Sequence, residues 1–238
     1  MISNFFIISN IFILILLNIC NFLKGTTTQI AIKEKAISKT SYIILSIISS
    51  ALYILGLFLT INSKIQKPDI LAPMIATTMY VSLLATVEDC KIFITNRWRS
   101  RICYLINTIL SFIYVGKIKS NMPLFSMRMF IIFFILIFLI PILWDIKIFG
   151  KSVGPQPGDS RMFMILFPIS MAILQNKILW GFLVWFIIMF SYHIIYMTIN
   201  KSKFNTKEEK DKVIVPLAPG ILLPPYIMFI LIWTGLIF

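Results

Sequence analysis

Four acidic residues adjoin apolar segments of this chain, where a carboxylate is costly. The chain has nine acids. Five are expected in loops or at a helix start, namely Glu34, Asp69, Glu208, Glu209 and Asp211. The remaining four are Glu88, Asp89, Asp145 and Asp159. Because a carboxylate at full depth in hydrocarbon costs about 2.5 to 3.5 kcal/mol, an acid in or near a membrane is a candidate functional residue.

A pair of these acids is capable of hydrolytic chemistry. Two carboxylates that face each other in a partly dry site share one proton, because two like charges at close range do not both ionise. The ionised group can then take a proton from water while the protonated one donates to a carbonyl oxygen. We therefore expect a site of two acids that activates water against a peptide bond beside the membrane.

Other chemistries find less support in the sequence. His193 is the single histidine, and no Ser/His/Asp or Cys/His set can be built around it with confidence. The three cysteines, Cys20, Cys90 and Cys103, are scattered and form no CxxC pair. A zinc site or a disulfide framework is therefore not expected. No phosphate-binding glycine loop is present, and we expect neither a metal nor a cofactor.

The composition predicts the elements that position these acids. In 238 residues, 59% are hydrophobic and only 13% are charged, which is too apolar for a water-soluble protein of this size. We expect an all-α, polytopic membrane bundle. Segments of roughly 17 to 25 apolar residues cross a bilayer, and about eight candidates are found. They are residues 5–23, 42–62, 70–87, 102–116, 129–143, 162–175, 178–199 and 214–238.

The distribution of basic residues predicts the orientation of these segments. The formal charge is +13, and most Lys and Arg fall in alternate loops, which marks those loops as cytoplasmic. Topology accounts for the charge, so nucleic-acid binding is not expected. The chain reads as one integral membrane domain over residues 1–238, with a short inner loop at 24–41. In this topology all four candidate acids lie at the inner membrane face.

Three local patterns surround the acids. Glu88 and Asp89 close a predicted helix, where acids oppose the helix dipole, so a functional reason is favoured. The run from Gly154 to Arg161 predicts a turn containing Asp159, which could also cap the next helix. The prolines between Pro216 and Pro225 predict irregular backbone, which membranes tolerate beside a cavity.

Taken in order, these patterns resemble the type IV prepilin peptidase family. The resemblance covers roughly residues 75 to 225. It comprises Asp89 followed by Ile94-Thr95-Asn96-Arg97, then Gly158-Asp159-Ser160-Arg161, and then Pro216-Leu217-Ala218-Pro219. It implies an aspartic endopeptidase with Asp89 and Asp159 as catalytic residues. Its substrate would be a type IV prepilin or pseudopilin, cleaved after a Gly at the cytoplasmic face of the cell membrane.

The chain departs from the family pattern at several positions. Gln156 replaces the first glycine of the GxGD turn, and Thr95 replaces a proline. Asn96 lies one residue nearer to Asp89 than in the family, so Glu88 remains an alternative first acid. Residues 24–41 contain no cysteine, whereas larger members that also methylate often carry a cysteine-rich segment there, so methylation is not expected.

Two other functions remain open. A presenilin-like intramembrane protease shares a GxGD turn and a late proline motif, and its substrates would be transmembrane helices. A transporter or non-enzymatic membrane protein could use the aspartates to bind a proton or a cation. Asp145 is the remaining competitor for a catalytic role, although it could simply pair with Lys147 or Lys151.

Overall fold

The computed structural model describes most of the chain. The described residues are 4–23, 37–92, 96–117, 131–132, 135, 147–148, 151–152, 157–174, 177–201, 216 and 218–236. Their helices are α1 (Asn4–Phe22), α3 (Lys39–Ile61), α4 (Pro68–Ile92), α5 (Arg97–Lys117), α7 (Pro157–Leu174), α8 (Ile178–Lys201) and α10 (Ala218–Trp233). Strands β1 (Lys147–Ile148) and β2 (Lys151–Ser152) pair antiparallel, with Lys147 opposite Ser152. Apart from this two-residue ladder, the regular structure in the described residues is helical, as the sequence predicts.

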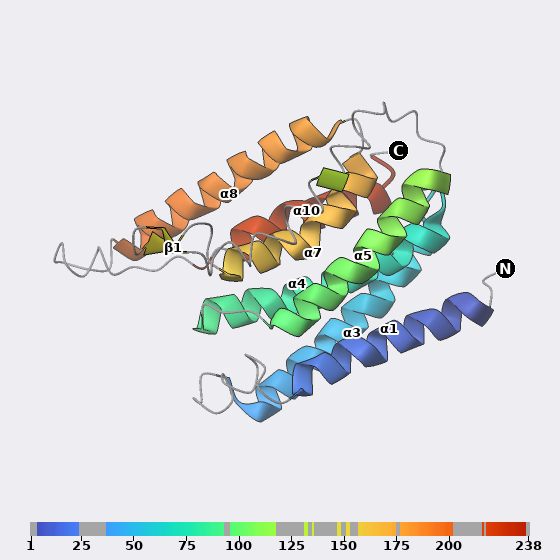
Figure 1. Cartoon of the computed structure of the whole chain (residues 1–238), viewed down its shortest axis with the longest axis horizontal. Coiled ribbons are helices and arrows are strands. Elements are labelled where there is room, and N and C mark those ends of the chain that lie inside the picture. The colour runs from blue at the N-terminus through green and yellow to red at the C-terminus, as the bar shows by residue number, and fades with distance from the viewer. Residues whose placement is uncertain are drawn as a thin grey trace.

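The helices form one bundle (Figure 1). Helices α1 and α3 lie along one side, α8 lies along the opposite side, and α4, α5, α7 and α10 lie between them. Helix α4 ends where α5 and α7 begin, at the left of Figure 1. We call this end of the bundle, defined by the last turn of α4 and the first turns of α5 and α7, the site end.

Helix α4 is the centre of the bundle. In its apolar stretch 83% of the residues are buried, against 6% in α8. It contacts α1, α3, α5, α7 and α10. Its approach to α3 depends on Gly56, because a Cβ there would lie only 3.0 Å from the Met79 sulfur and 3.2 Å from the Ala76 Cα. A residue at the end of α4 therefore has several helices within reach.

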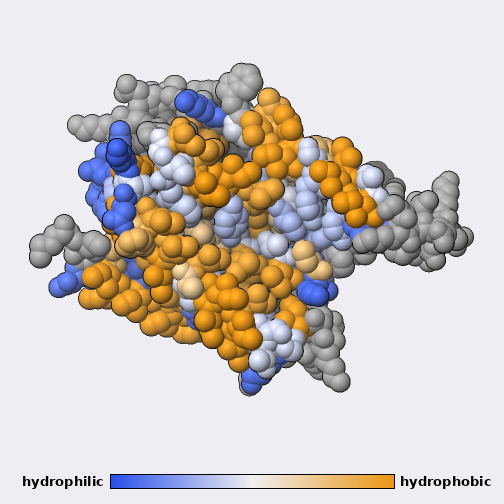
Figure 2. All heavy atoms as spheres, turned by 180° about the vertical axis from the view of Figure 1, so that it is seen from behind, coloured by the Kyte–Doolittle hydropathy of each residue, from blue (hydrophilic) through white to orange (hydrophobic). Residues whose placement is uncertain are grey.

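The chain is a membrane protein. Four described stretches are long and apolar enough to cross a bilayer: α1, α3, residues 68–91 of α4 and residues 183–200 of α8. Large apolar side chains such as Phe5, Phe58 and Phe190 are exposed, as expected for surfaces that face lipid. Figure 2 shows hydrophobic residues over much of one face, crossed by a pale band of weakly hydrophilic ones, with the most hydrophilic residues toward its margins.

The prediction of about eight spans is wrong for the described residues. Helix α5 overlaps a predicted span but is not among the stretches long and apolar enough to cross a bilayer, and it carries buried Arg99, Asn107 and Ser111. The apolar parts of α7 and α10 are shorter helices, at 164–174 and 218–233. The predicted span at 129–143 lies almost wholly outside the described residues.

Several predicted boundaries shift for local reasons. Helix α3 begins at Lys39 because the Ser38 hydroxyl accepts the Ser41 N–H at 3.0 Å, so the inner loop cannot extend to residue 41. Asp69 is the second residue of α4 instead of its cap. Asp159 is likewise inside α7, because that helix already begins at Pro157, and proline is favoured in a first turn.

Candidate functional site

The last turn of α4 points two adjacent acids at different parts of the bundle. Glu88 is fully buried and Asp89 is 7% exposed. Adjacent residues on a helix diverge by about 100°, so their side chains meet different neighbours. Asp89 contacts the beginning of α10, whereas Glu88 contacts α3 and α5. The two acids therefore have separate roles.

Asp89 is bound to the first residue of α10. The Ala218 N–H donates to Asp89 Oδ2 at 2.8 Å. The first N–H groups of a helix have no acceptor within the helix, and its positive dipole end favours an anion. The contact therefore gives the first N–H group of α10 an acceptor. It also joins Asp89 to Ala218, two residues that lie far apart in the sequence.

Glu88 forms a buried ion pair with Arg99. Arg99 Nη2 donates to Glu88 Oε2 at 2.6 Å, and both side chains are completely buried. The Tyr42 hydroxyl donates to Glu88 Oε1 and the Asn96 N–H donates to Glu88 Oε2, each at 2.9 Å. Removing one member of a buried pair costs about 3–5 kcal/mol, because the other charge stays buried without compensation.

Arg99 extends this contact to α1. Its Nη1 donates to Asn21 Oδ1 and to the Tyr42 hydroxyl, each at 2.9 Å. Asn96 also caps α5, because its Oδ1 accepts the N–H groups of Trp98 and Arg99 at 3.1 and 3.3 Å. We call Asn21, Tyr42, Glu88, Asn96 and Arg99 the Glu88-Arg99 cluster. It joins the ends of α1 and α4 to the beginnings of α3 and α5.

The hydrogen bonds continue from the cluster toward the middle of the bundle. Asn21 donates to the Tyr80 hydroxyl at 2.7 Å, and Tyr80 donates to Asn18 Oδ1 at 2.9 Å. Asn18 in turn donates to the Ser50 hydroxyl at 3.3 Å. This hydrogen-bonded network links α1, α3 and α4 inside the bundle.

Asp159 lies in the first turn of α7, which begins at the site end. Helix α7 contacts α4, α5 and α10. The side chain of Asp159 lies outside the described part of the structure, as does all of Asp145. The structure thus places the backbone of Asp159 at the same end of the bundle as Asp89 and assigns Asp89 its own partner, Ala218.

The sequence reading missed the cluster. It assigned Arg99 to a basic inner loop, but the residue lies in α5 and is fully buried. The available signals were Asn96, a favoured cap residue three positions before Arg99, and Asn18 and Asn21, two amides on one face of an apolar helix. Each is a polar residue that needs a buried partner.

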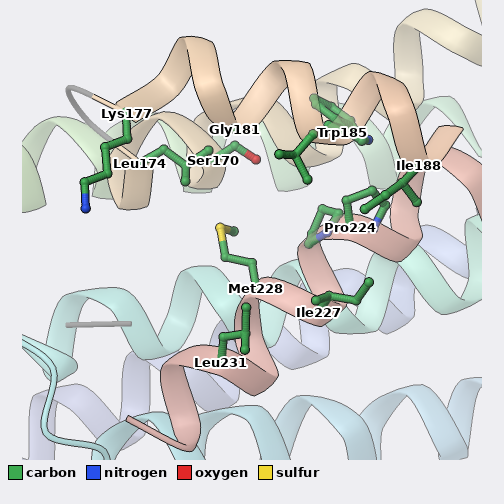
Figure 3. A pocket seen from close by; sticks show the side chains of 12 residues that line it. Ser170, Leu174, Lys177, Gly181, Trp185, Ile188, Pro224, Ile227, Met228 and Leu231 are labelled. Atoms are coloured by element: carbon green, nitrogen blue, oxygen red, sulfur yellow. The ribbon is translucent and has the colours of Figure 1, made fainter. Parts of the chain in front are cut away.

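An apolar cavity of about 300 Å³ lies further along α10 (Figure 3). Its walls include Trp185, Pro224 and Met228, with Lys177 at one end. No acid is among its lining residues. Within the described residues, no three His, Cys, Asp or Glu side chains lie close enough together to hold a metal ion. The described chemistry is therefore concentrated at the end of α4.

Comparisons with known proteins found no match for this chain among family models, curated proteins or solved structures.

Proposed function

We propose that the chain is a membrane-embedded aspartic endopeptidase that removes the leader peptide of type IV prepilins or pseudopilins. Asp89 and Asp159 are its catalytic pair. The observation that carries the proposal is the position of Asp89: a buried acid, bound to the start of α10 at the end of the bundle where α7 begins and carries Asp159 in its first turn.

The reaction needs only the two carboxylates and water. One carboxylate takes a proton from the attacking water, and the protonated partner donates to the carbonyl oxygen of the peptide bond. The water oxygen bonds to the carbonyl carbon. The C–N bond then breaks as the amine takes the proton held by the first carboxylate, and the hydroxyl formed from the carbonyl oxygen returns its proton to the second carboxylate as the C=O bond re-forms. A carboxylate pair at the rim of an apolar bundle supplies this chemistry where a substrate chain leaves the membrane.

The contacts of Glu88 support Asp89 as the first acid. The family spacing left Glu88 as an alternative, but the ion pair to Arg99 and the bonds from Tyr42 and Asn96 engage Glu88 on another side of α4. Asp89 instead contacts Ala218, which directly precedes Pro219 in the proline motif of the resemblance. The two motifs of the resemblance thus meet at Asp89.

We place the site end at the cytoplasmic face, because most basic residues of the loops gather on this side of the expected topology. Leader peptides of this class are short and positively charged and lie on the cytoplasmic side.

Cleavage of a pilin-type leader by the purified full chain tests the proposal. In detergent, the wild-type protein should convert a prepilin to a product shorter by the leader, with the cut after the Gly. Asp89→Asn retains an oxygen acceptor for Ala218 and should lose cleavage while remaining folded. Asp159→Asn should behave in the same way. Asp69→Asn is the matched control, because Asp69 is exposed at the opposite helix end.

The outcomes separate the proposal from its rivals. Full activity of both variants at positions 89 and 159 would exclude the aspartic mechanism. Cleavage of a transmembrane helix without cleavage of prepilin would favour the presenilin-like protease. No cleavage, together with ion flux in liposomes that depends on Asp89, would establish a transporter instead.

A further inference from the structure

The Glu88-Arg99 cluster has no part in the proposed water chemistry, yet it adjoins the acid that does. Burying two charges is costly, and packed apolar residues of similar volume often serve stability as well or better. Among the described residues, the other buried polar side chains apart from Asp89 are uncharged, so this pair is unusual in burying two charges. Stability alone therefore does not explain why a buried ion pair lies directly before Asp89.

The cluster fixes the rotation of the last turn of α4. Glu88 is held by Tyr42 on one side and by Arg99 and Asn96 on another. These partners belong to α3, α5 and the residue before α5, and Arg99 also reaches Asn21 on α1. Rotating the turn about its axis would draw Glu88 out of all these contacts. Asp89 follows any such rotation, because it is the next residue on the same turn.

The helix end needs such an anchor. Helix termini fray, and two consecutive acids at a C-terminus oppose the helix dipole. The guanidinium of Arg99 offsets the Glu88 charge by a direct, fully buried pair. Lys91 lies two residues beyond Asp89 but is exposed, so it does not replace that buried contact.

We propose that Arg99 is a positioning residue: through Glu88 it holds the last turn of α4 so that Asp89 faces the start of α10. The proposal rests on the proposed function in so far as Asp89 is catalytic. Its geometric part, that Arg99 determines where residue 89 points, stands apart from any activity.

A cross-linking experiment tests the geometric part without substrate. Asp89→Cys and Ala218→Cys are introduced together, with Cys20→Ala, Cys90→Ser and Cys103→Ala to remove other thiols. A short bifunctional thiol reagent should link positions 89 and 218 rapidly. Adding Glu88→Leu with Arg99→Met, an apolar replacement of the whole pair that avoids an unpaired buried charge, should slow the reaction severalfold. Tyr53→Phe is the control, because it removes a buried hydrogen bond to Asn10 in another part of the bundle.

Kinetics test the catalytic part in the protein with its native cysteines. Misplacing a catalytic group by about 1 Å can cost about 100-fold, so Glu88→Leu with Arg99→Met should lower kcat by about that factor and leave KM near its wild-type value. Arg99→Lys keeps the charge and should recover part of kcat. Tyr53→Phe should lower thermal stability and leave kcat unchanged.

Each outcome decides one part. If adding Glu88→Leu with Arg99→Met changes neither the cross-linking rate in the cysteine background nor kcat in the native background, the pair is merely structural and the positioning role is overturned. If cross-linking slows but the wild type cleaves no prepilin, positioning stands and the proposed function falls. If kcat drops while cross-linking is unchanged, Arg99 does not act through the direction of residue 89.

Discussion

Arg99 Nη2 lies 2.6 Å from Glu88 Oε2, with both side chains completely buried. One residue later, Asp89 accepts the backbone N–H of Ala218 at 2.8 Å. Glu88 thus joins α4 to α5, and Asp89 joins α4 to α10. The proposed chemistry depends on this division, because an acid occupied by Arg99 is not the one that activates water.

Breaking the buried ion pair should be more harmful than replacing it. Arg99→Met alone leaves the Glu88 charge buried, so we expect the free energy of unfolding to fall by about 3–5 kcal/mol. Glu88→Leu together with Arg99→Met should restore most of that loss. Unfolding by denaturant in detergent measures both. If the double variant is as unstable as Arg99→Met alone, the loss of stability does not come from leaving the Glu88 charge unpaired.

The amide of Asn96 should matter mainly as a helix cap. Asn96→Ala removes the acceptor of the Trp98 and Arg99 N–H groups and should cost about 1 kcal/mol. Asn96→Asp keeps that acceptor and loses the bond from Nδ2 to the Cys20 carbonyl, now 3.0 Å long. Comparing the unfolding midpoints of both variants separates capping from the link to α1. If Asn96→Ala and Asn96→Asp lower the unfolding midpoint equally, capping is not the main contribution of Asn96.

A methyl group at Gly220 should push α10 away from α8. A Cβ there would lie 2.6 Å from Tyr192 Cδ1, and overpacking of this kind costs about 1–3 kcal/mol. Gly220→Ala should therefore lower the thermal midpoint. Gly116→Ala is the matched control, since nothing lies within 4 Å of its Cβ position, and it should stabilise α5 slightly. A neutral Gly220→Ala would show that the two helices separate easily.

Trp185 should compensate for a proline in α10. Pro225 has no N–H to donate to the Ile221 carbonyl four residues earlier, and Trp185 Nε1 donates to that carbonyl at 2.7 Å. Trp185→Phe should cost about 1–2 kcal/mol. In a Pro225→Ala background, where the helix supplies its own donor, the cost should be smaller. Equal costs in both backgrounds, measured by unfolding, would contradict the compensation.

The sequence predicts most helices of this fold because apolar runs and prolines mark their positions. The predicted spans at 5–23, 42–62 and 178–199 coincide closely with α1, α3 and α8. The start of α5 was placed at Ile102 because Arg97, Arg99 and Arg101 read as loop charges. Only the buried partner Glu88, which lies on another helix, explains why an arginine enters the bundle.

The candidate site could be predicted only in part. The list of acids follows from the positions of the charges, and the choice of Asp89 over Glu88 follows from residue type, because the family's residue is an aspartate, whereas the family spacing favours Glu88. The partners of these acids depend on packing between distant segments: Ala218 lies 129 residues beyond Asp89, and Asn21 lies 78 residues before Arg99. No local pattern in a single sequence encodes such pairs.

The most direct test of the central claim compares leader cleavage by Asp89→Asn, Asp159→Asn and the combined variant. Catalytic groups that act as one unit give strongly non-additive losses. We expect each single substitution to lower kcat by about 10³-fold or more and the combined variant to be no worse than the weaker of the two. If the fold-loss in kcat of the combined variant equals the product of the two single losses, the two acids act independently. An unchanged kcat in either single variant would contradict the account.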